Sequence, residues 1–116
     1  MLEVTSESFE REVIQSPLPV MIDFWGPQCG PCLALMPKVD ALSERYGDRI
    51  KLTKVEAPKN RRLCLNLKVM SLPTFLFYKE GKEVDRLSGN ITVELIENSL
   101  NKLFQPERGT PSCRLS

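Results

Sequence analysis

The chain has 116 residues, of which 41% are hydrophobic and 27% charged, which is the composition of a globular protein with room for one domain and one core. Its 16 basic and 15 acidic residues leave a net charge of +1, so we expect no basic face for nucleic acid. The sequence has neither an apolar run long enough to cross a membrane nor a secretory signal at its start, so we expect a cytoplasmic protein without a membrane segment.

Hydrophobic spacing in the first half of the chain indicates alternating strands and helices. The expected elements are a strand over 2–5, a helix over 6–15, a strand over 20–25 and a helix over 29–46. Ser6 is the expected cap of the first helix. The run over 20–25 is apolar except for Asp23, which is typical of a strand covered on both faces. Pro37 lies inside the second helix and is expected to kink it rather than end it.

The second half of the chain predicts the rest of a mixed sheet. The expected elements are a strand over 50–56, a short helix over 60–67, a hairpin of strands 73–79 and 82–87 around Glu80-Gly81, and a last helix capped by Thr92. Helices between strands predict an α/β fold with helices on both faces of the sheet. We expect one domain over 1–104 and a flexible tail over 105–116, where Pro, Gly, Ser and Thr dominate.

The motif Cys29-Gly30-Pro31-Cys32 carries the chemistry expected of this chain. In a reducing compartment a close pair of cysteines is more often catalytic or metal-binding than structural. Residues three apart are neighbours on a helix, so the two sulfurs can reach bonding distance. The start of the helix favours a thiolate at Cys29, while Cys32 lies one turn further in. Because a more acidic thiol is also a weaker nucleophile, the placement of Cys32 should matter more than the acidity of Cys29.

A zinc site is the alternative for these cysteines. Four cysteine ligands would require Cys64 and Cys113, but structural sites usually use two closely spaced pairs, and the chain has no histidine. We therefore expect no metal and no cofactor. Cys64, among leucines, is expected to be a buried structural thiol. Cys113, in the tail, is expected to be exposed and is assigned no role.

The motif and its surroundings resemble the thioredoxin family from Val4 to Leu103. The segments that carry the resemblance are Asp23-Phe24-Trp25-Gly26, Cys29-Gly30-Pro31-Cys32, Pro37, Leu72-Pro73-Thr74 and Gly81. The resemblance implies the thioredoxin fold, with a central mixed sheet of about five strands flanked by four helices. It also implies a redox disulfide between Cys29, the nucleophile, and Cys32, the resolving thiol.

The resemblance assigns roles to two charged residues. Burial in an apolar strand should raise the pKa of Asp23, and the family uses the matching aspartate as proton acceptor for the second cysteine. The alternative is a carboxylate at the strand end that reaches solvent. Lys54 falls on the core-facing side of its strand, where the family pairs a lysine with the buried aspartate; the alternative is an edge lysine that reaches water.

The resemblance also implies an apolar rim where substrates dock. It implies a cis Leu72–Pro73 bond facing the cysteines, a Leu72 backbone that hydrogen-bonds an extended substrate, and Gly89 completing the rim. Trp25 is either a core residue or a contact surface. Gln28 departs from the family, which usually carries tryptophan there, and this leaves the substrate preference open.

The expected function is reduction of protein disulfides, because Gly30-Pro31 is the spacing dipeptide of the reducing members of the family. The expected partners are disulfide-bearing proteins and a thioredoxin reductase of unknown type, and the chain is expected to be a monomer. Two other functions stay open. One is a non-enzymatic subunit that binds a partner through the Trp25 and Pro73 face, and the other is a less reducing disulfide isomerase or oxidant.

Overall fold

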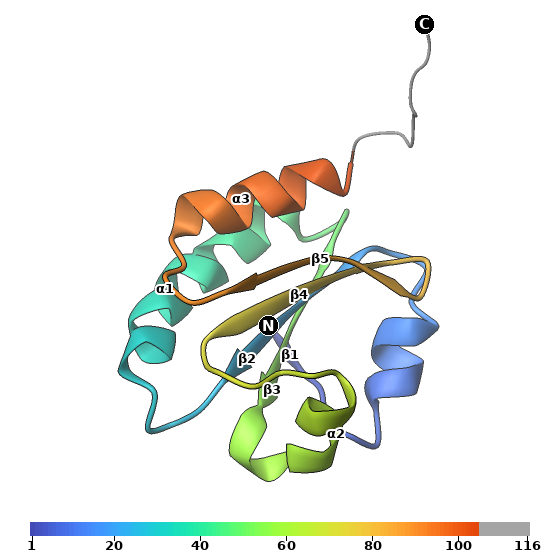
Figure 1. The fold of residues 1–116 in the computed structure, drawn as a ribbon. Coiled ribbons are helices and arrows are strands. Elements are labelled where there is room, and N and C mark those ends of the chain that lie inside the picture. The colour runs from blue at the N-terminus through green and yellow to red at the C-terminus, as the bar shows by residue number, and fades with distance from the viewer. Residues whose placement is uncertain (105–116) are drawn as a thin grey trace, which may run out of the picture.

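The computed structural model describes residues 1–104, so the predicted tail and Cys113 lie outside the described residues (Figure 1). The elements in chain order are β1 (Leu2–Glu3), the π-helix η1 (Glu10–Ile14), β2 (Val20–Trp25), α1 (Gly30–Tyr46), β3 (Lys51–Glu56), the 3₁₀ turn η2 (Ala57–Lys59), α2 (Arg61–Asn66), β4 (Thr74–Lys79), β5 (Lys82–Ser88) and α3 (Val93–Lys102). Within 1–104, no helix is long and apolar enough to span a membrane.

The five strands form one mixed sheet in the order β1-β3-β2-β4-β5. Strand β3 runs parallel to both β1 and β2, whereas β4 is antiparallel to β2 and β5 is antiparallel to β4. The predicted α/β fold, with a five-stranded mixed sheet and four helices, is confirmed.

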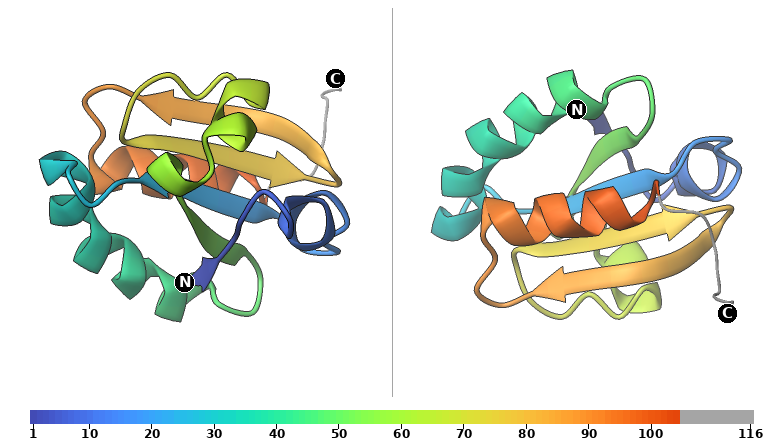
Figure 2. Two further views of the ribbon diagram at one scale, coloured as in Figure 1. Left: turned by 90° about the horizontal axis from the view of Figure 1, so that it is seen from below. Right: turned by 90° about the horizontal axis from the view of Figure 1, so that it is seen from above.

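Side chains of the central strand β2 alternate between two separate cores. Val20, Ile22 and Phe24 belong to the core that includes η1 and α2, whereas Met21 belongs to the core that includes α1 and α3. Figure 2 shows α1 and α3 together on one side of the sheet and α2 on the other. Since Asp23 shares the strand face of Met21, its side chain points toward the layer of α1.

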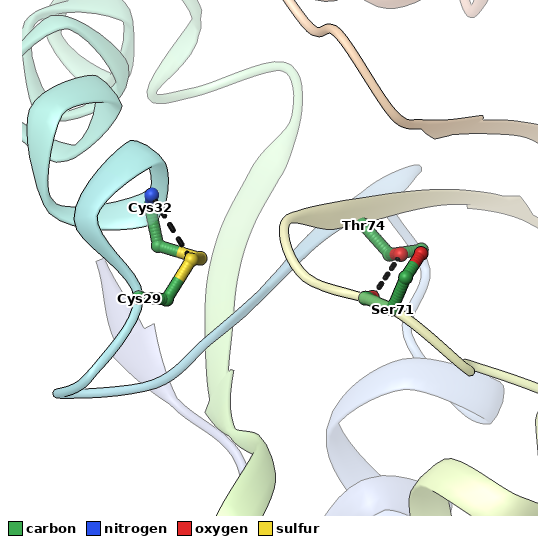
Figure 3. The surroundings of a disulfide bond; sticks show 4 residues. All are labelled: Cys29, Cys32, Ser71 and Thr74. Carbon is green, nitrogen blue, oxygen red and sulfur yellow. Dashed lines mark hydrogen bonds between the residues drawn. A yellow bond between two sulfur atoms is a disulfide. The ribbon is translucent and has the colours of Figure 1, made fainter.

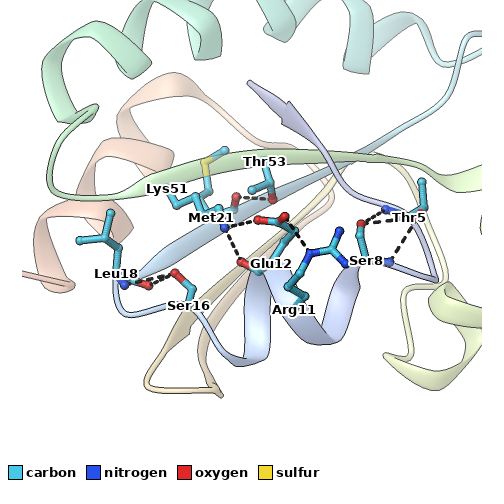
Figure 4. A network of polar contacts seen from close by, with 9 residues as sticks. All are labelled: Thr5, Ser8, Arg11, Glu12, Ser16, Leu18, Met21, Lys51 and Thr53. Carbon is cyan, nitrogen blue, oxygen red and sulfur yellow. Dashed lines mark hydrogen bonds and ion pairs between the residues drawn. The ribbon is translucent and has the colours of Figure 1, made fainter.

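The prediction of a helix over 6–15 was wrong for its first residues, because the helix begins at Glu10, and Ser6 is not its cap. Residues 6–8 form a turn in which Thr5 and Ser8 bond reciprocally: Thr5 N–H donates to Ser8 Oγ at 3.0 Å, and Ser8 N–H donates to the Thr5 carbonyl at 3.1 Å (Figure 4). Ser6 N–H donates instead to Asn60 Oδ1 at 2.9 Å. These bonds hold residues 5–8 in a turn directly before the helix, whose assigned bounds begin at Glu10.

The other boundaries agree closely with the predictions. Pro37 lies inside α1 without ending it, and Thr92 Oγ1 caps α3 by accepting a hydrogen bond from the Leu95 N–H at 3.2 Å. Glu80 and Gly81 both have positive φ, 53° and 79°, as a two-residue hairpin turn requires. Strand β4 begins at Thr74, so Pro73 stands just outside the ladder of hydrogen bonds that a proline would interrupt.

Candidate active site

A disulfide joins Cys29 and Cys32 at the start of α1 (Figure 3), with their Cα atoms 5.3 Å apart. Cys29 is the cap of the helix: its backbone is extended, and its Sγ accepts a hydrogen bond from the Cys32 N–H at 3.2 Å. The loop from β2 is closed by a hydrogen bond from the Cys29 N–H to the Gly26 carbonyl at 3.0 Å. The end of the buried strand and the first helical turn therefore fix both sulfurs.

The two sulfurs differ in their access to solvent. Cys32 is 1% exposed, whereas Cys29 is partly exposed. Gly30 and Pro31, the residues between them, are exposed at the helix start. Cys29 is therefore the cysteine of this pair that is open to a large partner, whereas Cys32 is covered.

Asp23 is a buried carboxyl group beneath the helix that carries the disulfide. It is 1% exposed, and neither carboxylate oxygen has a hydrogen-bond partner among the described residues. Burial raises the pKa of Asp23 to about 7, with a smaller upward effect from the charge of Asp40 and a downward effect from Lys54. Its carboxyl group can therefore take up and release a proton near neutral pH.

Lys54 lies beside Asp23 in the sheet but does not form the expected ion pair. The two residues are direct partners in the register of β2 and β3, yet neither carboxylate oxygen of Asp23 accepts a hydrogen bond from Lys54. Lys54 Nζ instead lies 5.7 Å from the centre of the Trp25 ring, and its side chain is half-buried. A cation over an indole face keeps contact with water, which full burial beside the carboxylate would remove. Lys54 therefore acts on Asp23 only through space, by lowering its pKa.

A groove of about 490 Å³ runs beside the disulfide. Its lining includes Pro31, Leu72, Pro73 and Gly89, four of the residues predicted to be at the site. The Leu72–Pro73 peptide bond is cis, as the resemblance implied. Next to it, Thr74 Oγ1 donates to the Ser71 carbonyl at 2.6 Å (Figure 3).

Two predicted contact residues lie outside this groove. Neither Trp25 nor Gln28 contributes to its lining; Trp25 is partly buried under Lys54, and Gln28 is exposed just before Cys29. The prediction missed Ala34, Leu35 and Lys38, which form the helical wall of the groove. Their spacing of three, four and seven residues from Pro31 places them on one face of α1, and this pattern could have identified them.

The remaining cysteine of the described residues is not part of this site. Cys64 is a free, buried thiol on α2, and burial raises its pKa. Within residues 1–104, no group of three or more His, Cys, Asp or Glu side chains could hold a metal ion.

A surface-accessible sulfur at a helix start, a buried partner sulfur and a titrating carboxyl group on an α/β scaffold define a dithiol–disulfide oxidoreductase. The sequence profile of the Thioredoxin family matches residues 1–102. A thioredoxin of Porphyra purpurea is 40% identical over 100 residues, which cover 86% of this chain and 94% of that protein. Thioredoxin 1 of Synechococcus elongatus is 36% identical over 99 residues, which cover 85% of this chain and 92% of the relative.

The chain belongs to the thioredoxin family. It is a thiol–disulfide oxidoreductase that reduces protein disulfides, and the alternatives of a non-enzymatic subunit and of an isomerase or oxidant gain no support from these relatives. Thioredoxins act on disulfides of protein substrates and are themselves reduced by thioredoxin reductase.

Proposed function

We propose that this chain reduces protein disulfides in the cytoplasm, as a monomer, with Cys29 as the attacking thiolate and Cys32 as the resolving thiol. The observation that carries this assignment is the unequal access to the two sulfurs, since only Cys29 is partly exposed. A thioredoxin reductase would return the disulfide to the dithiol. The positive end of α1 favours the thiolate at its cap.

The reaction has two exchange steps. The Cys29 thiolate attacks one sulfur of the substrate disulfide, a mixed disulfide forms, and the first substrate thiolate leaves and takes a proton from water. Cys32 then loses its proton, and its thiolate attacks the Cys29 sulfur. The second substrate thiolate leaves and is protonated, so two electrons pass from the dithiol to the substrate, and the disulfide between Cys29 and Cys32 remains.

Asp23 is the proposed proton acceptor for Cys32. The two groups are both buried, and Asp23 points toward the layer of the helix that carries Cys32. A carboxyl group with a pKa of about 7 is partly ionised at neutral pH and can accept the proton in the second step. Lys54 is a positioning residue in this scheme, because its charge stabilises the ionised carboxylate from the neighbouring strand.

The groove beside the disulfide is the proposed path of the substrate chain. Leu72, Pro73 and Gly89 would contact the residues next to the substrate disulfide, and Pro31 forms the wall nearest the redox centre. Gln28 and Trp25 would contact the substrate on the other side of Cys29. An exposed amide at Gln28 favours polar substrate residues there, so Gln28→Trp should raise activity toward apolar substrates.

Reduction of insulin by dithiothreitol, followed as turbidity, tests the proposal. The parent chain should accelerate the reaction, and Cys29→Ser should abolish the acceleration. Cys32→Ser should instead accumulate a mixed disulfide with the substrate, detectable by mass spectrometry. Asp48→Asn is the control and should keep the activity, because Asp48 is exposed in the loop after α1 and lines neither the groove beside the disulfide nor any other surface assigned to the substrate.

Asp23→Asn should slow the release of the mixed disulfide by about 100-fold at neutral pH, the lower range for loss of a general base. The rate of the first attack should change little. Equal rates of release in the variant and the parent would remove Asp23 from the mechanism. No acceleration of insulin reduction by the parent chain would contradict the proposal as a whole.

A further inference from the structure

A second apolar groove, of about 450 Å³, lies along α2, and Leu72 is the one lining residue that it shares with the groove beside the disulfide. Its floor is formed by Ala57, Cys64, Val69 and Leu72. The large side chains at its rim are unusually open to solvent for apolar residues: Leu65 is 66% exposed and Met70 is 79% exposed. Adjacent exposed apolar side chains beside a groove are a common feature of protein-binding surfaces.

The surroundings of this groove are basic. Residues 57–72 contain four basic residues and no acidic one, although the whole chain has a net charge of only +1. The four are Lys59, Arg61, Arg62 and Lys68, and all of them are exposed. Among these four residues, and within the described part of the chain, only Lys59 has an ion-pair partner: its Nζ lies 3.7 Å from Glu56 Oε1. The side chain of Arg61 donates only to the Pro58 carbonyl, at 3.4 Å. Of the four, Arg61 lines the groove itself, and the charge of the segment around the groove is largely uncompensated.

The groove is continuous with the redox site. Leu72 lines both this groove and the one beside the disulfide. Gly26, in the loop before the attacking cysteine, is in close contact with the same wall, since a Cβ there would lie 3.3 Å from Leu72 and 3.6 Å from Pro58. A protein whose disulfide lies at Cys29 can therefore extend across Leu72 onto α2.

We propose that the α2 surface, made of Arg61, Arg62, Leu65, Lys68 and Met70, binds disulfide-bearing protein substrates that carry an apolar side chain flanked by carboxylates near the disulfide. The apolar side chain would enter the groove between Leu65 and Met70, and the carboxylates would face the arginines. This inference rests on the proposed function and adds a substrate class to it. Opposite charges at such a rim mainly accelerate association, so the preference should appear in kcat/KM and should weaken with salt.

Three synthetic peptides with one intramolecular disulfide test the inference. They carry the same disulfide loop, followed by a tail with Glu-Leu-Glu, Lys-Leu-Lys or Ser-Gly-Ser. The reduced protein should convert the acidic peptide with a kcat/KM about fivefold above the neutral one, the range for one or two exposed charge pairs, and the basic peptide should be the slowest. Equal rates for the acidic and neutral peptides would overturn the inference. Conversion of none of the three would instead contradict the proposed function.

Matched variants locate the effect on α2. Arg61→Glu should abolish the advantage of the acidic peptide and leave the neutral peptide unchanged, because Arg61 lines the groove and glutamate is well tolerated in the first turn of a helix. Lys82→Glu makes the same charge change at the hairpin, at the opposite end of β4 from Pro73, and should keep the advantage. Equal losses in the two variants would show a general effect of net charge and overturn the assignment to α2.

The apolar part of the surface has its own pair of variants. Met70→Gln should reduce the advantage of the acidic peptide, whereas Leu95→Gln, on α3 at the other face of the sheet, should not. A second copy of the chain and an oligonucleotide are the other possible occupants. If the chain dimerises in sedimentation experiments and Met70→Gln abolishes the dimer, the proposal is overturned. It is also overturned if a single-stranded oligonucleotide inhibits peptide reduction and the free acidic peptide does not.

Discussion

Replacing Asp23 with asparagine should change the stability of the oxidised protein in a pH-dependent way. The free energy of unfolding of the variant, compared with that of the parent, should be more favourable at neutral pH than at acid pH. In the unfolded chain the carboxyl group ionises at its ordinary pKa near 3.8, whereas burial in the folded protein raises the pKa to about 7. Between these two values the folded state binds one more proton than the unfolded state, so the free energy of unfolding decreases as the pH rises. The contribution of Asp23 is thus most favourable below about pH 4 and falls until about pH 7.

The size of the effect follows from the two pKa values. The difference corresponds to about 4 kcal/mol in total, or about 1.4 kcal/mol per pH unit within the window. Asparagine does not titrate, and the cost of burying its amide is the same at every pH. The difference in unfolding free energy between Asp23→Asn and the parent should therefore rise across the window and level off above about pH 7.

Guanidinium chloride unfolding of both oxidised proteins at a series of pH values measures this difference. The oxidised form is the right one to use, because its active-site cysteines are joined and do not titrate. Asp48→Asn is the matched substitution at an exposed position in the loop after α1. A difference between Asp23→Asn and the parent that stays constant from about pH 4 to pH 8 would refute the assignment of a buried, titrating carboxyl group.

Three further substitutions test the packing of the fold by thermal or denaturant unfolding. Gly81→Ala should destabilise the fold by about 1–2 kcal/mol, because φ there is +79° and a Cβ would lie 3.0 Å from a backbone oxygen of η1; an unchanged Tm would contradict that turn. Leu100→Ala should cost about 2–5 kcal/mol as a cavity in the α1 and α3 core, and a loss below 1 kcal/mol would show a loosely packed position. Arg86→Met should cost about 1–3 kcal/mol, since the guanidinium donates to the Leu67 and Lys68 carbonyls at 2.7 and 2.9 Å; Arg86→Lys should recover only part of that, and full recovery would show that charge alone suffices.

The sheet and the redox motif were predictable because both depend on short-range patterns. The apolar run that became β2 was predicted with its observed bounds, Val20–Trp25, since a strand covered on both faces needs apolar residues at nearly every position. The turn at Glu80-Gly81 was also predictable, because few residues adopt the backbone angles of a two-residue hairpin turn.

The errors arose where distant segments meet. The first helix starts at Glu10 rather than at Ser6, and the Ser6 N–H donates to Asn60 Oδ1, 54 residues away, at 2.9 Å. Nothing in the local sequence indicates that contact. The resemblance implied a pairing of Lys54 with Asp23, and the two residues are partners in the sheet, but the Lys54 side chain lies over the ring of Trp25 on the neighbouring strand. Strand neighbours can be inferred from a pattern of residues, whereas the choice between two nearby partners depends on burial and hydration in the folded protein.

The two outer strands of the sheet give the protein resistance to strand addition. An exposed edge with free backbone groups can pair with another extended chain and so begin aggregation. Here β1 contains two residues, and β5 carries Lys82, Glu83, Asp85 and Arg86 and an irregular register opposite Phe77 and Tyr78. Short, charged and irregular edges pair poorly. A protein that reduces the disulfides of other proteins therefore meets their chains without a regular sheet edge to which they could add.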